Sequence, residues 1–397
     1  MTGSEAAKAV YLHVGAPTAG GAFLQKALWD NRKRLGASGV RHPVEGPLEH
    51  FGAVMDLRDM TWGGHRDPAW EGAWNAVARR ARNWDGHAVV LSQELLGGAT
   101  AEQAARAVES FGDAEVHVVF VTRDLGTQLV LDWQEQILHT HTIPFGRFTG
   151  DLIEHGIDAP EPFGEMFWGL HDPLRVLGTW ETVVPRERIH VITLPAPGTG
   201  PGLLWSRFCE ATGIDPGACD VSGVAEPEPL SVLEAELLRR LNGRLGPALG
   251  GDYERVVRGH LTGSALAEAA DAAGRAPMGL PPGQAAWAAQ RTREIVASLR
   301  VSGYRVHGDL GELTEPGLPA APLQPRDLPE DDLAEAALSV IVQLLERLSA
   351  ARERVGLAQL RADLNGVQEG LDKLLEVATT QPAPGLRKAV RRAGMGR

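Results

Sequence analysis

Short, almost continuously apolar runs alternate with helical patterns over the first half of the chain. The apolar runs are rich in β-branched residues and lie at residues 9–14, 88–91, 116–121 and 189–194. Strands of this kind are typical of parallel sheets that are covered on both faces. Between them, apolar positions recur at helical spacing over residues 22–35, 69–82 and 101–110. The alternation predicts an α/β fold with a doubly wound, mostly parallel sheet flanked by helices.

The strand signal fades after residue 232, where residues 233–245 and 284–301 follow helical patterns. A proline-rich stretch at residues 315–329 can continue neither a helix nor a central strand. We therefore expect four parts along the chain. They are an α/β domain over residues 1–314, a linker over 315–330, a helical extension over 331–380 and a flexible basic tail over 381–397.

Heptad-like spacing marks the helical extension. Apolar residues alternate at four and three positions along Ala337, Ile341, Leu344, Leu348, Ala351 and Val355, and a second run follows at Leu357, Leu360, Leu364, Val367, Leu371 and Leu374. This predicts a coiled-coil-like seam with a phase break near Gly356. The seam can pack on its own domain or pair with another chain. Its length favours a homo-oligomer or protein partner bound through residues 333–378, although three glycines weaken the helix.

Composition narrows the function classes. The 397 residues are 43% hydrophobic and hold 39 Lys and Arg against 51 Asp and Glu, a net charge of −12. This balance argues against a nucleic-acid partner, because phosphate neutralisation needs a basic surface. No apolar run is long enough to span a membrane, and the first residues lack a secretion signal. With only Cys209 and Cys219, a disulfide framework is not expected, so we predict a cytoplasmic protein.

The loop after the first predicted strand is the most informative segment. Residues 13–25 follow a strand and open a helix, and they are rich in Gly and Ala. Small residues let the backbone turn tightly, and a helix N-terminus adds the positive end of its dipole. The loop therefore suits a phosphate or sulfate. A plain strand-to-helix turn is the alternative, and the Gly-Lys-Ser/Thr ending of a Walker A motif is absent.

This segment resembles the 5′-phosphosulfate loop of sulfotransferases that use 3′-phosphoadenosine 5′-phosphosulfate (PAPS). The bacterial branch of that family has His-Val-Gly-Ala-Pro-Lys-Thr-Gly-Thr-Thr-Phe-Leu-Gln here. Further short motifs match in order at residues 28–32, 39–43, 50–53, 56–58, 92–95, 123–125, 133–135, 184–185, 193–195, 204–208, 303–306 and 308–310. The resemblance covers roughly residues 9–316 and implies a P-loop sulfotransferase fold that uses PAPS as the sulfuryl donor, with no metal.

The resemblance also implies which residues hold the donor, and it exposes departures. The 5′-phosphosulfate would lie on Gly15, Ala16, Pro17, Thr18, Gly20, Gly21 and Ala22, and the 3′-phosphate on Arg123. Thr18 stands where the family has a catalytic Lys, and Ala19, Gly21 and Ala22 replace its Thr residues. Leu131 replaces a Ser that binds the 3′-phosphate. Losing one donor of electrostatic stabilisation commonly costs about 3–4 kcal/mol in the transition state.

Two residues are candidates for the base that deprotonates the acceptor. His50 is first, because related sulfotransferases carry acceptor-side groups after the first helix and because an imidazole titrates near neutral pH. Glu94 is second, because it directly follows the strand at 88–91. A non-catalytic polar contact is the alternative for both. For Glu94 this would be a place in the first turn of a helix that Ser92 caps.

Other polar and aromatic motifs have simpler interpretations. We expect His13 to be a buried, hydrogen-bonded core residue. His139 and His141 have no further ligand at metal-site spacing, so a solvent-facing loop is expected there. Residues 151–172 are rich in Gly, Pro and aromatic residues. They form either a lid or acceptor-pocket wall, or a loop whose aromatic side chains cover the core.

Two functions follow from these observations. The first is transfer of a sulfuryl group from PAPS to a hydroxyl of a small-molecule or glycan acceptor. The second is a catalytically degenerate member of the fold that acts as a binding or assembly module. The missing loop Lys favours the second, whereas the retained Arg123 favours the first. A P-loop kinase is disfavoured by the absent Gly-Lys-Ser/Thr ending.

Overall fold

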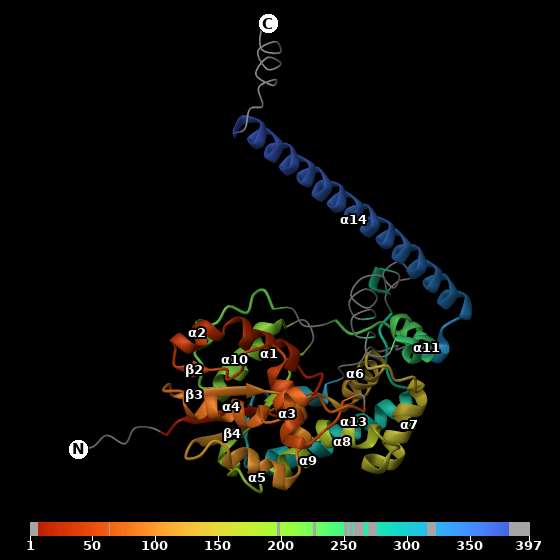
Figure 1. The fold of residues 1–397 in the computed structure, drawn as a ribbon. Helices are drawn as coiled ribbons and strands as arrows, with labels where there is room; N and C mark the ends of the chain where they lie inside the picture. The colour runs from red at the N-terminus through yellow and green to blue at the C-terminus, as the bar shows by residue number, and fades with distance from the viewer. Residues whose placement is uncertain are drawn as a thin grey trace, which may run out of the picture. The chain divides into compact units, whose positions relative to one another are not determined.

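A six-stranded, fully parallel sheet forms the centre of the α/β region in the computed structural model (Figure 1). The structure describes residues 7–62, 64–196, 199–224, 228–249, 253, 257, 266–268, 276–315 and 323–380. The strands are β1 (Ala9–His13), β2 (Val40–Arg41), β3 (Ala88–Ser92), β4 (Glu115–Thr122), β5 (Ile189–Thr193) and β6 (Arg305–His307). Their order across the sheet is β2-β3-β1-β4-β5-β6. The predicted doubly wound parallel sheet is confirmed.

The four predicted strands are all present, and the two that the sequence did not reveal are the sheet edges. β2 has two residues and β6 has three, so neither offers a run of apolar residues long enough to detect. Arg305 in β6 is exposed, which removes the continuous apolar signal that marks the central strands. β3 and β5, by contrast, are buried at every position.

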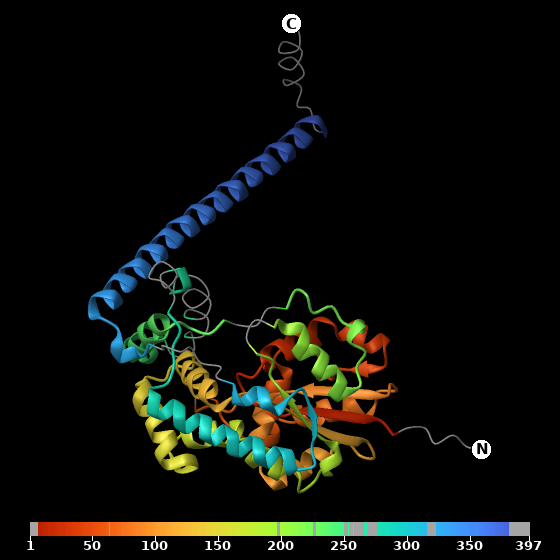
Figure 2. The ribbon, with the colours of Figure 1, turned by 180° about the vertical axis from the view of Figure 1, so that it is seen from behind.

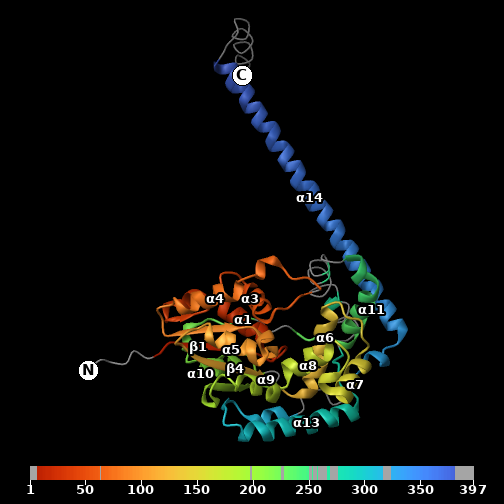
Figure 3. The same ribbon diagram turned by 60° about the horizontal axis from the view of Figure 1, so that its bottom comes forward.

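Helices cover both faces of the sheet (Figures 1 and 2). α1 and α10 lie on one face, and α5 and α9 lie on the other. α13 packs along α6 and α9 (Figure 3). The helix bounds are α1 (Gly21–Asp30), α2 (Arg32–Ala37), α3 (Glu49–Arg58), α4 (Ala73–Arg82), α5 (Ala101–Glu109), α6 (Leu125–Leu138), α7 (Phe145–His155), α8 (Phe163–His171), α9 (Pro173–Trp180), α10 (Pro201–Thr212), α11 (Val232–Leu249), α13 (Pro282–Val301) and α14 (Glu330–Thr380).

The first predicted helix is divided in two at Asn31. The Asn31 side chain donates to the carbonyl of Ala27 and exchanges hydrogen bonds of 2.9 Å in both directions with the backbone of Asp220. Because the Asn31 side chain is hydrogen-bonded to a distant loop, α1 ends here and α2 starts in a new direction. The helix predicted over 69–82 is shortened similarly, because Gly72 takes a φ of 76° between the short turn η1 (Pro68–Trp70) and α4.

Residues 151–172 are mostly helical, so the expectation of a loop was wrong, whereas the expectation that their aromatic side chains cover the core is confirmed for Phe167 and Trp168. They form the end of α7, a single 3-10 turn and all of α8. Phe167 and Trp168 are buried on α8, and the Trp168 indole donates to the carbonyl of Leu152. The Gly and Pro content suggested a loop, but burial of the aromatic side chains stabilises helices instead.

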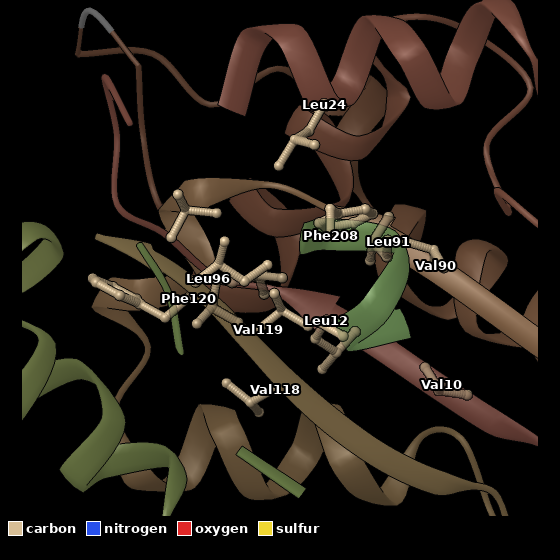
Figure 4. Close-up of a cluster of buried hydrophobic side chains, with 14 of the residues drawn as sticks. Val10, Leu12, Leu24, Val90, Leu91, Leu96, Val118, Val119, Phe120 and Phe208 are labelled. Atoms are coloured by element: carbon tan, nitrogen blue, oxygen red, sulfur yellow. The ribbon is translucent and has the colours of Figure 1, made fainter. Parts of the chain in front are cut away.

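The hydrophobic core lies on both sides of the central strands (Figure 4). Val10 and Leu12 of β1 are surrounded by side chains of the two neighbouring strands, including Leu91 of β3 and Val118 of β4. Leu24 of α1 and Phe208 of α10 complete the cluster in Figure 4. This packing holds the carboxyl end of β1, and hence the loop after it, in a fixed position.

Contacts divide the chain into two compact units. The first comprises residues 1–253 and 270–333, and the second comprises 254–269 and 334–397. Within the second, Arg347 of α14 forms an ion pair of 2.9 Å with Glu268. α14 continues without interruption past Gly356, where the heptad phase changes. The predicted basic tail at 381–397 lies outside the described residues. Within the described part of the chain, no helix combines the length and apolarity needed to cross a bilayer.

Candidate functional site

The loop between β1 and α1 lies where the direction of strand addition reverses. From β1 the chain crosses to β2 and returns through β3, and it then continues to β4 on the opposite side of β1. The loops after β1 and β4 therefore leave in opposite directions. In open α/β sheets, ligands bind in the crevice at this switch point, outside the carboxyl ends of the strands.

Only part of the loop backbone is available to a ligand. The Ala16 amide donates to the carbonyl of Val121 at 2.7 Å, the Ala19 amide donates to the carbonyl of Ala16, and Pro17 has no N–H. The amides of Thr18, Gly20, Gly21 and Ala22 donate no backbone hydrogen bond of this kind among the described residues. α1 has no side-chain cap at its N-terminus. The backbone amides free to bind an anion thus lie in the half of the loop nearest the helix.

Arg123 reaches this loop from the end of β4. Its Nη1 donates a hydrogen bond of 2.9 Å to the carbonyl of Thr18. Thr18 has a φ of 56°, an uncommon left-handed conformation for a β-branched residue. The Thr18 hydroxyl is buried, and no group in the described part of the chain forms a hydrogen bond with it. Thr18 therefore carries both the carbonyl that the Arg123 guanidinium binds and a buried hydroxyl without a hydrogen-bond partner among the described residues.

Glu94 places a carboxylate on the same loop. It opens the 3-10 helix η2 (Glu94–Gly98) after β3, and Gln25 of α1 donates to its Oε2 at 2.6 Å. A Cβ at Gly21 would coincide with Oε1 of Glu94, so the carboxylate lies directly against the first residue of α1. Burial raises the pKa of Glu94. A half-buried carboxylate at a helix N-terminus both competes with an incoming anion and can accept a proton.

The expected cap of η2 is a different residue. Gln93, not Ser92, caps this helix, because its side chain accepts a hydrogen bond from the amide of Leu95. The Ser92 hydroxyl instead lies 2.7 Å from Nδ1 of His13. His13 is fully buried, as predicted, and burial lowers its pKa to about 4. This pair fixes the last residue of β1 to the last residue of β3 below the loop.

A buried polar network supports the loop from the other side, and the sequence did not reveal it. Gln128 of α6 donates to the carbonyl of Pro17 at 2.9 Å and contacts the His171 imidazole. His171 Nε2 lies 3.1 Å from Asp132 Oδ1, and both side chains are buried. In the sequence, the polar residues Gln128, Asp132 and Gln136 recur at every fourth position of a buried helix. This spacing is the feature from which the network could have been predicted. His171 is distant in sequence and carries no signal of its own.

His50 does not reach the loop through any interaction that the described residues show. It lies on α3 and is buried, and its ring centroid is 6.5 Å from that of His42, which follows β2. Burial and the neighbouring His42 lower the pKa of His50 to about 4, so its imidazole is neutral near pH 7. β2 is two strands from β1, or about 10 Å at ordinary strand spacing. A hollow of about 370 Å³ lies against α3 beside Trp70.

His139 and His141 flank the end of α6. His139 lies 3.0 Å from Glu135 one turn earlier in the same helix, and Thr140 follows with a φ of 76°. The His139 ring also lies 5.1 Å from the Trp62 ring, and the His141 ring lies 5.1 Å from the Phe163 ring, so this helix terminus packs against neighbouring aromatic side chains. In the part of the chain that the structure describes, no group of three or more His, Cys, Asp or Glu side chains is placed to hold a metal ion.

Comparisons with known proteins give one structural likeness. No protein-family model matches the sequence, and no curated protein matches it either. Among solved structures, a sulfotransferase from Alicyclobacillus acidocaldarius aligns with a TM-score of 0.36 and 16% sequence identity. The alignment covers 62% of this chain and 94% of that one.

Proposed function

We propose that this chain is a sulfotransferase that takes a sulfuryl group from PAPS and passes it to a hydroxyl of a small-molecule or glycan acceptor. The proposal rests on one observation. The Arg123 guanidinium binds the loop after β1 at the switch point of the sheet, beside the buried Thr18 hydroxyl. The guanidinium brings a permanent positive charge to the loop, which has no Lys or Arg of its own before α1.

The chemistry requires charge stabilisation more than covalent assistance. As the bond between sulfur and the bridging phosphate oxygen breaks, the electron pair stays on that oxygen, and a new bond forms between sulfur and the acceptor oxygen. The resemblance assigned Arg123 to the 3′-phosphate, but its hydrogen bond to Thr18 favours a role at the 5′-phosphosulfate loop instead. There Arg123 and the uncapped N-terminus of α1 would stabilise the developing negative charge. The Thr18 hydroxyl would donate to the same anionic group.

The acceptor proton needs a base, and Glu94 lies closest to the loop after β1. Its carboxylate contacts the first turn of α1, whereas His50 lies on α3 near the end of β2. Burial raises the pKa of Glu94, which makes its carboxylate a stronger base than an exposed one. We therefore assign the proton to Glu94 rather than to His50.

A second function has its own support. The Glu94 carboxylate lies against the N-terminus of α1, where the donor's anionic group would bind, and no loop Lys offsets it. A negative charge there disfavours a nucleotide that is itself strongly anionic. In that case the chain is a degenerate sulfotransferase that acts as a binding or assembly module.

The two functions separate in a calorimetric titration with 3′,5′-adenosine bisphosphate. If the donor site is live, the parent chain binds, Arg123→Ala loses at least tenfold in affinity, and Arg123→Lys loses less. Glu94→Gln should then bind about tenfold tighter, because a negative charge is removed. The same variant should transfer sulfate from PAPS at least a hundredfold more slowly, because the base is lost. Glu109→Gln, an exposed carboxylate variant on α5, is the matched control.

A degenerate site gives the opposite pattern. The parent would not bind the bisphosphate, and binding would appear only when Thr18→Lys restores the loop charge or Glu94→Gln removes the carboxylate. Release of 3′,5′-adenosine bisphosphate from PAPS, measured over a panel of glycans and small alcohols, would then stay at background in the parent.

A further inference from the structure

α14 presents apolar side chains on two opposite faces. On one face, Ala336 and Val340 are buried, and Arg347, seven residues after Val340, bonds to Glu268. At 100° per residue these three positions lie within about 40° of one another around the helix axis. The side chains of that face therefore already have contacts within the same chain.

The opposite face is exposed although it carries large aliphatic side chains. Leu338, Ile341, Val342, Leu345 and Leu348 are exposed by 57%, 51%, 54%, 60% and 58%. We call these five residues the α14 stripe. The heptad seam predicted from the sequence coincides with the stripe only in part, because two of its members, Ala337 and Leu344, are half-buried. A stripe of five large aliphatic side chains on one helix is typical of an interaction surface.

The spacing of the stripe points to a second copy of this chain. Leu338, Ile341, Leu345 and Leu348 are separated by three, four and three residues, a pattern that is the same in both directions. In an antiparallel pair of α14 helices centred on position 343, Leu338 faces Leu348 of the other copy and Ile341 faces Leu345. Four of the five stripe residues then meet a stripe residue, and Val342 lies opposite the half-buried Leu344, as in an isologous two-fold interface.

Charge complementarity selects the antiparallel arrangement. Glu335 is exposed just before the stripe, and Arg352 is exposed just after it. In the antiparallel pair, position 334 of one copy lies opposite Arg352 of the other. Glu335 is the next residue, so it lies beside that Arg352. In a parallel pair, Glu335 would face Glu335 and Arg352 would face Arg352, which is repulsive at both ends.

We propose that this protein forms an antiparallel homodimer through the α14 stripe, with Glu335 and Arg352 pairing across the two-fold axis. The stripe extends about 15 Å along the helix, so the interface is small. We therefore expect a concentration-dependent dimer with a dissociation constant in roughly the micromolar range.

Sedimentation equilibrium of the full chain over a range of concentrations tests the association. The expected result is a mass that rises from 42.5 kDa toward twice that value. Leu345→Glu should weaken the dimer at least a hundredfold while its helical circular dichroism is unchanged. Val301→Glu alters an equally apolar residue that is 83% exposed outside the stripe, and it should leave the dimer intact. A monomer at every concentration, or a Leu345→Glu variant that associates normally, would overturn the proposal.

A charge exchange tests the direction of the pair. Glu335→Arg and Arg352→Glu should each weaken the dimer about tenfold, and the double variant should restore it. A parallel dimer would show no such rescue, because each change would only replace one like-charged pair by another. In a mixture of Leu338→Cys and Leu348→Cys chains, oxidation should link one variant to the other. Links within each variant alone would contradict the antiparallel arrangement.

Discussion

Gly21 is the residue on which the geometry of the candidate site depends most directly. It starts α1, and the carboxylate of Glu94 fills the space that any side chain at this position would need. The sequence offers Gly21 as one of several small residues in a loop, and a tight turn is the usual reason for such a residue. The structure gives a different reason, which is the close approach of a carboxylate from η2.

Gly21→Ala should therefore displace Glu94 and break its hydrogen bond with Gln25. We expect a loss of about 1 kcal/mol in the free energy of unfolding, measured by chemical denaturation, because the displaced carboxylate gives up its hydrogen bond. Gly178→Ala is the control, since that helical glycine of α9 has open space around it. It should gain about 0.5–1 kcal/mol from helix propensity. Equal effects of the two variants would show that Glu94 does not rest on Gly21.

At the scale of elements, three strands are joined by a row of histidines. His117 of β4 lies 3.0 Å from His190 of β5, and His190 lies 3.0 Å from His307 of β6, each through ring nitrogens. Tyr11 of β1 contacts the His117 ring, and Glu210 of α10 lies 3.3 Å from His307. The charged groups around the row are Arg188, Arg305 and Glu115. Burial lowers the pKa of His117 to about 4 and that of His190 to about 3.

This row makes the stability of the sheet depend on pH. Because the folded pKa values lie below the unfolded value near 6.5, the unfolded chain binds more protons as the pH falls. The stabilisation is complete above pH 6.5 and is lost between pH 6.5 and about 4. His190 alone should account for about 2 kcal/mol of the loss between pH 6.5 and 5.

Urea denaturation at pH 8, 6 and 5 measures this dependence, and His190→Gln should make it shallower. His65→Gln changes an exposed histidine and should leave the slope unchanged. A free energy of unfolding that does not change between pH 8 and 5 would contradict the neutral histidine row.

The sequence predicted the centre of the fold better than its edges and its site. Strands such as β4 are almost continuously apolar, so the sequence predicted their type and position directly. β6 has three residues, one of them exposed, and its place beside β5 depends on tertiary packing. The loop after β1 was found because small residues mark it. The contact of Arg123 with Thr18 joins residues 105 positions apart, and no local pattern encodes that distance.

At the scale of the whole molecule, the candidate site and the α14 stripe belong to different compact units. The loop, Glu94, Arg123 and the Gln128 network all lie within the unit of residues 1–253 and 270–333. The stripe lies within the unit that contains residues 334–397. The two features also have different chemistry, since the proposed donor site is lined by amides and a guanidinium whereas the stripe is an aliphatic surface. Nucleotide binding and self-association should therefore be separable functions.

A double-variant cycle tests this separation. Leu345→Glu should change the mass of the protein but keep its affinity for 3′,5′-adenosine bisphosphate within about twofold, and Arg123→Ala should change the affinity but not the mass. The coupling energy between the two changes should stay below about 0.5 kcal/mol, as for independent sites. Calorimetry and sedimentation on the same four proteins give both quantities. A Leu345→Glu variant that loses nucleotide affinity would contradict this separation. It would mean that association contributes to the proposed site, because the loop, Glu94 and Arg123 are unchanged in that variant.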